Sequence, residues 1–545
     1  MEVVEIRDLD GPNVFLLQPA IKLELLATEA DLSADALSAL VARLEALGIS
    51  DEERGEGESA LGDLLTAATA AVHERAGLAE PEIVWTSLET PGHYALAFGW
   101  ERRRFGVSLA RLVGALATGE AIDVDAEAEG LRKLRRGDDP EDRPRLLRDG
   151  DRTIPIIGVT GTNGKTTTTR LIAHILRTAG ERVGWTSTVG VYIDGELVLE
   201  GDYTGPAGAW RVLEEPGLET AVLETARGGI LLRGLAYESN DIGVVTNVSG
   251  DHLGLHGIQS VDGLAQVKAT VVRVTRPSGY AVFNADDERV RGLASTVRAS
   301  PFWITQEAEN PTVVADVAAG GRALIVKDGA IVETRGGKEA VLIDLAAVPI
   351  TFGGRARHMI ENVLCAAAAC LGRGLDREVV AAGLRSFGTD PSHNPGRLHV
   401  YDVDGATAII DYAHNEVGLR YLLELASGYR GEGGRLTAII GTAGDRTDDA
   451  LRELGRLAAS AGDRVLVKET QRYLRGRASA DEMNALFLEG IEAGGNPPHE
   501  IVRSELEAVE VALADLKPGD VMAMMCIEEG PVVRQRLGER GRTVS

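Results

Sequence analysis

The chain contains very little cysteine, with three such residues among 545. Two of them, Cys365 and Cys370, lie in an alanine-rich stretch that is typical of a helix, where small apolar side chains pack well. We interpret them as core residues and not as a redox pair. No group of cysteines and histidines has the spacing of a zinc site, so the sequence predicts none.

Long apolar runs are also missing. No stretch approaches the roughly 20 apolar residues that cross a bilayer. The N-terminal residues MEVVEIRDLDGP are acidic and contain no signal-peptide core. Together with the few cysteines, these absences predict a cytoplasmic protein without a membrane segment.

Positive charge is scarce as well. The formal net charge is −26, which argues against a nucleic-acid or anionic-membrane partner because both need basic patches. Only eight of the 57 basic residues are lysines. Each lysine is therefore more informative than usual, above all Lys165, Lys268 and Lys468.

The length of the chain predicts three or four domains. Residues 1–135 have the pattern of a small α+β domain, without a nucleotide or catalytic signature, and we expect a docking or substrate-presenting role. The expected elements are strands at 3–6 and 14–17, helices at 34–47 and 59–76, strands at 94–100 and near Phe105, and a helix at 109–116. Residues 136–153 are charged and interrupted by proline, which is typical of a linker.

Two α/β domains are predicted to follow. In residues 154–395, apolar strands alternate with helices, which predicts a mainly parallel sheet covered on both faces. The expected strands lie near 154–159, 182–187, 219–223, 242–246 and 279–283, with a hairpin at 189–199, short strands in 310–352 and two helices in 359–387. Residues 396–545 form the last domain, with strands near 407–410, 435–440, 463–467, 499–502 and 520–524.

The clearest functional motif spans residues 154–180. An apolar strand ends in a turn that contains Gly161 and Gly164, and Lys165 then begins a helix. Glycines let backbone N–H groups approach a polyphosphate, the lysine contacts its oxygens, and Thr166 is able to ligate Mg²⁺. The common phosphate loop has a glycine where Val159 stands, so a plain glycine turn remains an alternative. Nucleotide binding is the interpretation that we prefer.

Further polar residues follow the predicted strands. Glu224 ends the strand at 219–223, where an acid is able to hold Mg²⁺ beside a phosphate loop, although a charge at a helix N-terminus is the alternative. Asp251 and His252 follow the strand at 242–246. Lys268 lies on the next predicted helix beside apolar positions, where a lysine usually extends its charge to solvent.

These motifs, together with Asp411-Tyr412-Ala413-His414-Asn415, resemble the Mur ligases. The stretches GDYTGPAGAW, VLETARGGILLRGL, DHLGLHGI, NPGRL and GTAGDR are similar in particular to the Mur-ligase half of cyanophycin synthetases. The opening IRDLDGPNVF resembles the N-terminal domain of those enzymes. The resemblance implies a central mononucleotide-binding domain with a phosphate loop and a Rossmann-like C-terminal α/β domain.

The resemblance also implies a reaction and its residues. ATP phosphorylates a carboxylate, and an amine attacks the acyl phosphate to form an amide. The nucleotide is expected to contact Gly161, Thr162, Asn163, Gly164, Lys165, Thr166, Thr167, Asn362, Arg397, Asp411 and His414. The expected Mg²⁺ ligands are Thr166 and Glu224, with His252 and a carbamylated Lys268 serving a second ion. The catalytic residues implied are Lys165, Glu224, His252, Lys268 and Arg397.

The sequence departs from the family pattern in several places. Cyanophycin synthetases place an ATP-grasp domain before the Mur-like part, whereas here a short charged segment leads directly to Ile154. We therefore expect a separate ATP-grasp ligase to work alongside this protein. His358-Met359-Ile360-Glu361-Asn362 replaces the usual Phe-Asn-x-x-Asn. Glu416 stands where a proline normally follows the motif Asp-Tyr-Ala-His-Asn.

The expected substrates are a carboxylate, with an aspartyl side chain as the first guess, and an amino acid or amine. Lys468, Arg475 and Arg477 are candidate substrate contacts, with a charged loop surface as an equal alternative. A homo-oligomer is expected. The other functions considered are a folyl- or peptidoglycan-type ligase and a non-catalytic ATP-binding partner of a polymerising complex.

Overall fold

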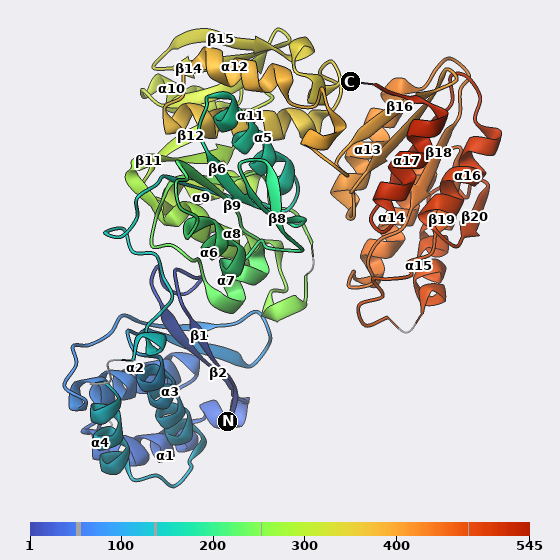
Figure 1. Cartoon of the computed structure of the whole chain (residues 1–545). Coiled ribbons are helices and arrows are strands. Elements are labelled where there is room, and N and C mark those ends of the chain that lie inside the picture. The colour runs from blue at the N-terminus through green and yellow to red at the C-terminus, as the bar shows by residue number, and fades with distance from the viewer. Residues whose placement is uncertain (51–55, 136–138, 252, 478, 545) are drawn as a thin grey trace.

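The structure is a computed structural model that describes residues 1–50, 56–135, 139–251, 253–477 and 479–544. In this part of the chain the strands form three sheets, of four, eleven and seven strands. Each predicted domain contains one sheet, and Figure 1 shows the first domain in blue, the second in green to yellow and the third in orange to red.

The N-terminal domain packs helices on an antiparallel sheet with the strand order β1-β2-β4-β3. Its strands are β1 (Glu2–Leu9), β2 (Ala20–Leu26), β3 (Ile83–Ser87) and β4 (His93–Gly99), and its helices are α1 (Ala34–Leu44), α2 (Glu58–Arg75), α3 (Arg103–Thr118) and α4 (Val124–Leu134). Alternate residues of β2, Ile21, Leu23 and Leu25, are fully buried and face these helices. Ser33 caps α1 as an N-cap residue, accepting from Ala36 N at 3.4 Å.

Two predictions for this domain were wrong. The apolar residues 14–17 form no strand, because the side chain of Asn13 accepts from the backbone N–H groups of Phe15 and Leu16 and folds the segment into a turn. Phe105 lies in α3, buried against the core, and not in a strand. In both cases apolar residues that suit a strand adopt another structure, a turn at 14–17 and a helix at Phe105, and an apolar pattern alone does not distinguish these.

The segment that was predicted as a linker lies against the central domain. Leu147 forms a parallel bridge with Tyr237, and its N–H donates to Ala236 O at 2.9 Å. Arg152 pairs with Asp241 at 3.0 Å, with its side chain almost fully buried. Residues 139–153 are therefore attached to the domain that follows.

The central domain is built on the eleven-stranded sheet, with the order β15-β14-β13-β12-β11-β10-β5-β9-β6-β7-β8. The strands from β13 to β6 in this order are parallel, and an antiparallel pair extends each end. The strands are β5 (Ile156–Thr160), β6 (Val183–Thr186), β7 (Gly190–Ile193), β8 (Glu196–Glu200), β9 (Thr220–Glu224), β10 (Asn240–Val245), β11 (Thr275–Asn284), β12 (Ser300–Thr305), β13 (Arg322–Lys327), β14 (Ala330–Arg335) and β15 (Lys338–Asp344).

Helices cover both faces of this sheet. One face carries α5 (Lys165–Thr178), α11 (Arg357–Arg373) and α12 (Arg377–Ser386). The other carries α6 (Pro206–Leu213), α7 (Arg227–Arg233), α8 (Val261–Arg273), α9 (Glu288–Leu293) and α10 (Pro311–Ala318). The prediction of strands alone in residues 310–352 missed α10, which Asn310 caps at 3.1 Å and Pro311 begins. Cys365 and Cys370 are buried in α11.

The C-terminal domain has the order β20-β19-β18-β21-β17-β16-β22, parallel from β20 to β17. Its strands are β16 (His399–Val403), β17 (Ala406–Asp411), β18 (Leu436–Ile440), β19 (Arg464–Lys468), β20 (His499–Val502), β21 (Val521–Met525) and β22 (Arg542–Val544). Helices α13 (Glu416–Tyr429), α14 (Asp448–Ala461) and α15 (Ala480–Ala493) cover one face, and α16 (Glu505–Asp515) and α17 (Gly530–Arg540) the other. The predicted three-domain α/β fold class is confirmed.

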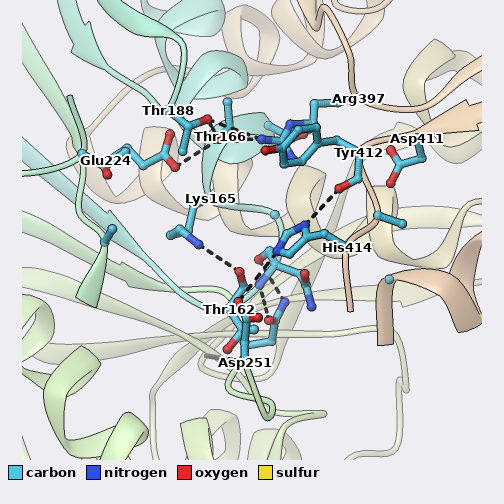
Figure 2. A pocket seen from close by; sticks show the side chains of 18 of the residues that line it. Thr162, Lys165, Thr166, Thr188, Glu224, Asp251, Arg397, Asp411, Tyr412 and His414 are labelled. Carbon is cyan, nitrogen blue, oxygen red and sulfur yellow. Dashed lines mark hydrogen bonds and ion pairs between the residues drawn. The ribbon is translucent and has the colours of Figure 1, made fainter. Parts of the chain in front are cut away.

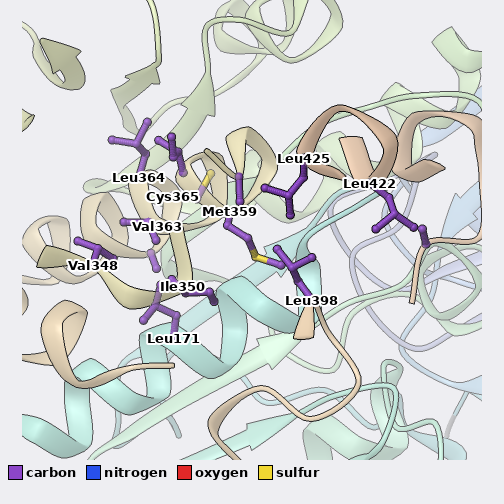
Figure 3. Close-up of a cluster of buried hydrophobic side chains, with 14 of the residues drawn as sticks. Leu171, Val348, Ile350, Met359, Val363, Leu364, Cys365, Leu398, Leu422 and Leu425 are labelled. Carbon is purple, nitrogen blue, oxygen red and sulfur yellow. The ribbon is translucent and has the colours of Figure 1, made fainter. Parts of the chain in front are cut away.

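One cluster of buried apolar residues joins the last two domains. It includes Met359 and Val363 of α11 together with Leu398, Leu422 and Leu425 of the C-terminal domain, as Figure 3 shows. Because apolar surface is removed from water across the boundary, the two domains are held together by more than their polar contacts. None of the helices in the described residues is both long and apolar enough to cross a membrane.

Candidate active site

The phosphate loop connects the buried strand β5 to helix α5. Gly161 and Gly164 have φ angles of +150° and +84°, which side chains rarely allow. A Cβ at Gly161 would lie 1.9 Å from Thr246 Oγ1, and one at Gly164 would lie 2.0 Å from Asn362 Oδ1. Only glycine therefore fits at both positions.

The end of β10 holds this loop in place. Thr162 N donates to Asn247 O and Asn163 N donates to Asn247 Oδ1, both at 2.8 Å. Thr246 Oγ1 donates to Asn163 O at 2.7 Å. These bonds pre-organise the loop at the N-terminus of α5, where the helix dipole favours an anion.

Lys165, which is partly exposed, and the buried Lys268 meet beneath the loop. Lys165 Nζ donates to Gly161 O at 3.1 Å and to Thr162 O at 2.9 Å, and Lys268 Nζ, from α8, donates to Gly161 O at 2.6 Å. Burial lowers the pKa of Lys165, against the charge of Glu224. Burial, followed by the charge of Lys165, lowers the pKa of Lys268 well below its usual value.

Glu224 faces the loop from the end of β9. Its Oε1 accepts from Thr166 Oγ1 at 3.0 Å, whereas its buried Oε2 has no hydrogen-bond partner among the described residues. Burial raises the pKa of Glu224, against the charges of Lys165 and Arg397. A carboxylate oxygen and a hydroxyl are hard ligands that suit Mg²⁺, and the unsatisfied Oε2 fits such an ion.

Arg397 reaches this place from the start of the C-terminal domain. Its Nη2 donates to Thr166 Oγ1 at 3.5 Å and to Thr188 Oγ1 at 3.4 Å, and its guanidinium lies 4.2 Å from the ring centre of Tyr412. Figure 2 shows Arg397 and Tyr412 opposite Glu224 and Lys165. Residues from two domains thus converge on the phosphate loop.

Two other contacts close the pocket between the domains. Asn163 Nδ2 donates to Asn415 Oδ1 at 3.4 Å, and Asn415 Nδ2 donates back to Asn163 Oδ1 at 3.1 Å. Asp251 of the central domain pairs with Arg446 of the C-terminal domain, and its Oδ2 lies 3.7 Å from His414 Nε2. His414 Nδ1 hydrogen-bonds to Tyr412 O at 3.0 Å.

The far end of the pocket is formed by α11 and α13. His358 stacks on Tyr421 with ring centres 5.4 Å apart, and Asn362 Oδ1 accepts from Thr168 Oγ1 at 3.4 Å. Glu361 Oε1 accepts from Asn247 Nδ2 at 2.6 Å. Burial raises the pKa of Glu361 to about 8, with Asn247 opposing this shift and Asp287 and Asp286 adding to it. Aromatic, amide and neutral acid groups here suit a heterocyclic base.

The structure brings most of the predicted residues to one cavity of about 610 Å³. The predicted residues that line it are Thr162, Asn163, Gly164, Lys165, Thr166, Thr167, Glu224, Lys268, Asn362, Arg397, Asp411, His414 and Arg475. Gly161 lies directly below, as the acceptor for both lysines. His252 lies outside the described residues. No group of three His, Cys, Asp or Glu side chains in the described part would hold a metal unaided.

The suggested substrate contacts are placed differently. Lys468 is fully buried, with Nζ 3.0 Å from Glu505 Oε1 and 3.7 Å from Glu528 Oε2, so the prediction that it contacts substrate was wrong. Arg477 pairs with Asp448 and Glu482, each at 2.7 Å, and so fastens a loop to α14 and α15. Arg475 lines the cavity and pairs with Asp445 at 2.7 Å.

Several cavity residues were missed as functional candidates. Thr188, Asp202 and Arg227 line it, as do Glu361, Tyr421 and Arg446. Asp202 and Arg227 lie in motifs that carried the family resemblance, GDYTGP and ETARGG, so a signal was present for them. Thr188 lies in no such motif, and only the approach of Arg397 reveals it.

Comparison with known proteins agrees with this geometry. The family model for the Mur ligase middle domain matches residues 159–370, and that for the Mur ligase glutamate ligase domain matches residues 396–526. A UDP-N-acetylmuramoyl-L-alanyl-D-glutamate–2,6-diaminopimelate ligase of Gloeobacter violaceus is 30% identical over 379 residues, covering 68% of this chain and 72% of that protein. The chain belongs to the Mur ligase family. The motifs of the sequence predicted this membership.

Other members show higher identity over the same share of the chain. The cyanophycin synthetase of Synechocystis sp. is 40% identical over 360 residues, which are 66% of this chain and 41% of that protein. The chain thus spans about two fifths of these relatives. The solved structure of E. coli FolC with DHPP and ADP shares the Mur ligase fold, with a TM-score of 0.53 at 21% identity over 71% of this chain and 89% of FolC. The expected resemblance to the Mur-ligase half of cyanophycin synthetase is confirmed.

Proposed function

We propose that the chain activates a carboxylate of an acidic, aspartyl-type acceptor with ATP and joins it to an amino acid or amine. The observation that carries this proposal is the convergence of Lys165, Thr166 and Glu224 with Arg397 of the next domain on one cavity. Identity of about 40% to cyanophycin synthetases supports an acceptor of this class.

The proposed mechanism assigns a task to each group. The loop from Gly161 to Lys165 holds the phosphates of ATP, and Arg397 neutralises charge on the group in transfer. The acceptor oxygen attacks the γ-phosphorus and ADP leaves. The amine nitrogen then attacks the acyl carbon, inorganic phosphate leaves, and the nitrogen loses a proton. Closure of the C-terminal domain keeps water from the acyl phosphate.

The metal sites are part of the proposal. Thr166 and Glu224 would hold Mg²⁺, which supplies charge neutralisation at the transferring phosphoryl group. By resemblance, His252 and a carbamylated Lys268 would support a second ion. Asn362 would contact the adenine, and Asp411 and His414 the ribose side. Relatives with solved structures include one with Mn and AMPPNP bound, which supports a divalent ion in this fold.

The biological setting is also proposed. Because no ATP-grasp domain separates the first unit from Ile154, we propose that a separate ATP-grasp ligase extends the acceptor that this enzyme modifies. A homo-oligomer and a cytoplasmic location remain predictions. A peptidoglycan-type ligase is the second candidate, favoured by the 72% coverage of the Gloeobacter violaceus relative.

A substrate screen tests the proposal. Purified protein is incubated with ATP, Mg²⁺, aspartate-containing peptides and single amino acids, and both phosphate release and product mass are measured. We expect phosphate release that depends on the amino acid, with a product heavier by one amino acid less water. Absence of both with every pair would contradict the proposal.

The K268A variant is the matched control for that screen. We expect turnover to fall by about 100-fold or more, because the variant lacks the group that would support the metal ion beside the transferring phosphate. Circular dichroism and thermal unfolding should show an intact fold. Full activity of K268A would show that Lys268 has no catalytic part.

A further inference from the structure

Arg170 is a buried cation that the proposed mechanism does not use. It lies on α5, five residues after Lys165, and is only 5% exposed. Its Nη1 donates to Asn394 Oδ1 at 3.3 Å and to Pro395 O at 3.2 Å, and both acceptors are uncharged. Because a buried charge costs free energy unless its partners offset that cost, a guanidinium held in this way points to a task beyond packing.

The two acceptors belong to the segment that connects the central domain to the C-terminal domain. This segment, residues 394–398, runs from the end of a short 3₁₀-helix to the start of β16, and we call it the hinge segment. Asn394 is buried, and its Nδ2 donates to Thr167 Oγ1 of α5 at 3.3 Å. The helix that begins at the phosphate loop therefore holds the first residues of the hinge segment through two side chains, Arg170 and Thr167.

Asn394 connects this attachment to Arg397. Arg397 N donates to Asn394 O at 3.2 Å, and Asn394 Nδ2 donates to Arg397 O at 3.4 Å. Burial, followed by the charge of Arg397, lowers the pKa of Arg170 to about 10, so this guanidinium stays protonated at neutral pH. Because like charges repel, the two arginines are linked by the hydrogen bonds of the hinge segment and not by attraction.

The C-terminal domain fixes the other end of the hinge segment. Leu398 N donates to Asp411 Oδ2 at 2.7 Å, and Gly396 N donates to His399 Nε2 at 3.1 Å. Leu398 has a φ angle of +47°, which is rare for a residue with a bulky side chain and persists only where the surroundings hold it. The backbone on both sides of Arg397 is therefore fixed, by α5 before it and by the C-terminal domain after it.

We propose that Arg170 is a positioning residue, which through Asn394 holds the hinge segment so that the guanidinium of Arg397 is aimed at the phosphate loop. Arg397 lines the active-site cavity, whereas Arg170 is not among the described residues that line it. Loss of Arg170 should therefore act only through Arg397. The inference rests on the proposed function, in which Arg397 neutralises charge on the phosphoryl group in transfer.

The difference in affinity between AMPPNP and ADP tests the position of Arg397 without requiring turnover. Calorimetry with the full chain and Mg²⁺ gives both dissociation constants, and their ratio measures the contribution of the γ-phosphate. We expect R397A to reduce the wild-type preference for AMPPNP by about 10- to 100-fold, as for hydrogen bonds between charged groups. R170M keeps a long side chain without donors, and it should reduce the preference by about 10-fold and leave the affinity for ADP within about threefold.

A double-mutant cycle decides whether Arg170 acts through Arg397. The variant with both R170M and R397A should have the same preference as R397A alone, because a guanidinium that is absent cannot be misplaced. R170K should keep most of the preference, since its ammonium still donates to the hinge segment, and it serves if R170M does not fold. R177M is the matched control and should match the wild type, because Arg177 lies on the exposed side of α5, where it pairs with Asp194 at 3.2 Å.

An unchanged preference in R397A or in R170M would overturn the inference, even if R170M unfolds at a lower temperature. Separate effects that multiply in the double variant would overturn it as well, because Arg170 would then act independently of Arg397. If the preference depends on Arg170 through Arg397 but no acid–amine pair gives product, the positioning role stands and the ligase proposal falls. If product forms while R170M keeps the preference, the ligase proposal stands and the positioning role falls. In turnover assays, R170M should lower kcat by about 10-fold and leave KM for ATP within about threefold.

Discussion

Burial opposes charge on several single residues around the phosphate loop. It lowers the pKa of Lys165 and Lys268 and raises the pKa of Glu224 and Glu361. Acids and bases with opposite shifts in one cavity are typical of sites that bind and transfer charged groups. Lys165 and Glu224 reduce each other's shift, whereas Glu361 has no cation among the causes of its shift.

Glu361 should make stability depend on pH. The pKa of Glu361 is about 8 in the folded protein, against 4.5 for an ordinary glutamate. Between pH 4.5 and pH 8 the folded state therefore keeps a proton on Glu361 that the unfolded state has released. The stabilisation is full below pH 4.5 and is lost as pH rises toward 8, by up to about 1.4 kcal/mol per pH unit. The amide oxygen of the E361Q variant still accepts from Asn247, but the amide does not titrate. We therefore expect the free energy of unfolding of E361Q to fall less than that of the wild type as pH rises from 4.5 to 8.

Urea unfolding between pH 5 and 8 measures the effect. The control is E378Q on the exposed side of α12, where water surrounds the side chain in both states. Equal pH slopes for wild type and E361Q would contradict the shifted titration of Glu361.

Helix α5 makes the glycine loop suitable for phosphate because the loop lies at the N-terminus of this helix. A glycine lies near each of its ends, and the two differ only in their surroundings: Gly164 faces Asn362 Oδ1, whereas nothing lies within 4 Å of a Cβ built at Gly180. Both have positive φ, +84° and +90°. Substitutions at Gly164 and Gly180 therefore distinguish the effect of backbone strain, which both share, from the effect of a clash in the phosphate loop, which only Gly164 has.

We expect G164A to abolish nucleotide binding and G180A to preserve it. Each substitution places a side chain in the left-handed region, at about 1 kcal/mol. Only G164A also drives a methyl group into Asn362, which must displace the loop. Calorimetry with AMPPNP and thermal unfolding measure the two effects, and normal AMPPNP affinity in G164A would refute the tight loop geometry.

The three domains are connected at the scale of the whole molecule by specific contacts. Asp10 N donates to Arg233 O at 2.8 Å, and a Cβ at Gly11 would lie 1.8 Å from Leu235 O. Glu89, between β3 and β4, accepts from Ser260 N at 2.8 Å at the start of α8, the helix that carries Lys268. The N-terminal domain thus contacts two helices that border the active site.

The Asn163–Asn415 pair should favour the closed arrangement of the last two domains. The N163A variant removes both side-chain hydrogen bonds and leaves the backbone bonds of the loop to Asn247 unchanged. We expect a larger radius of gyration with AMPPNP bound than in the wild type, by small-angle X-ray scattering, and a higher KM for the amine. Q535A, on the exposed face of α17, is the control.

A double-mutant cycle with N415A isolates the contact, because Asn415 also caps α13 through Gly418 N at 2.9 Å. We expect a coupling energy of about 0.5–1.5 kcal/mol in the nucleotide-bound state. Additive effects, or unchanged scattering of N163A, would show that closure does not depend on this pair.

Patterns within short segments were sufficient to predict much of this protein. The strand before Gly161, the helix after Lys165 and the acid at the end of β9 follow from apolar periodicity and glycine placement, and strand ends of a parallel sheet meet at one edge. The turn at Asn13 and the helix after Asn310 escaped because single side chains redirect the backbone there. Residues 189–199 formed the expected hairpin, with Asp194 and Gly195 at positive φ in its turn.

Contacts between distant parts of the chain were beyond such patterns. The sequence suggested Lys468 as a substrate contact, yet folding buries it against Glu505, and Arg397 meets Thr166 across 231 positions of sequence. Whether a cation is paired depends on which carboxylates packing brings near. The distinction between Arg446, which pairs with Asp251, and Arg227, which has no carboxylate partner among the described residues, therefore exists only in three dimensions. The loop from Gly161 to Thr167 was therefore predictable as a phosphate site from its own residues, whereas the groups that complete it were set by the packing of two domains against each other.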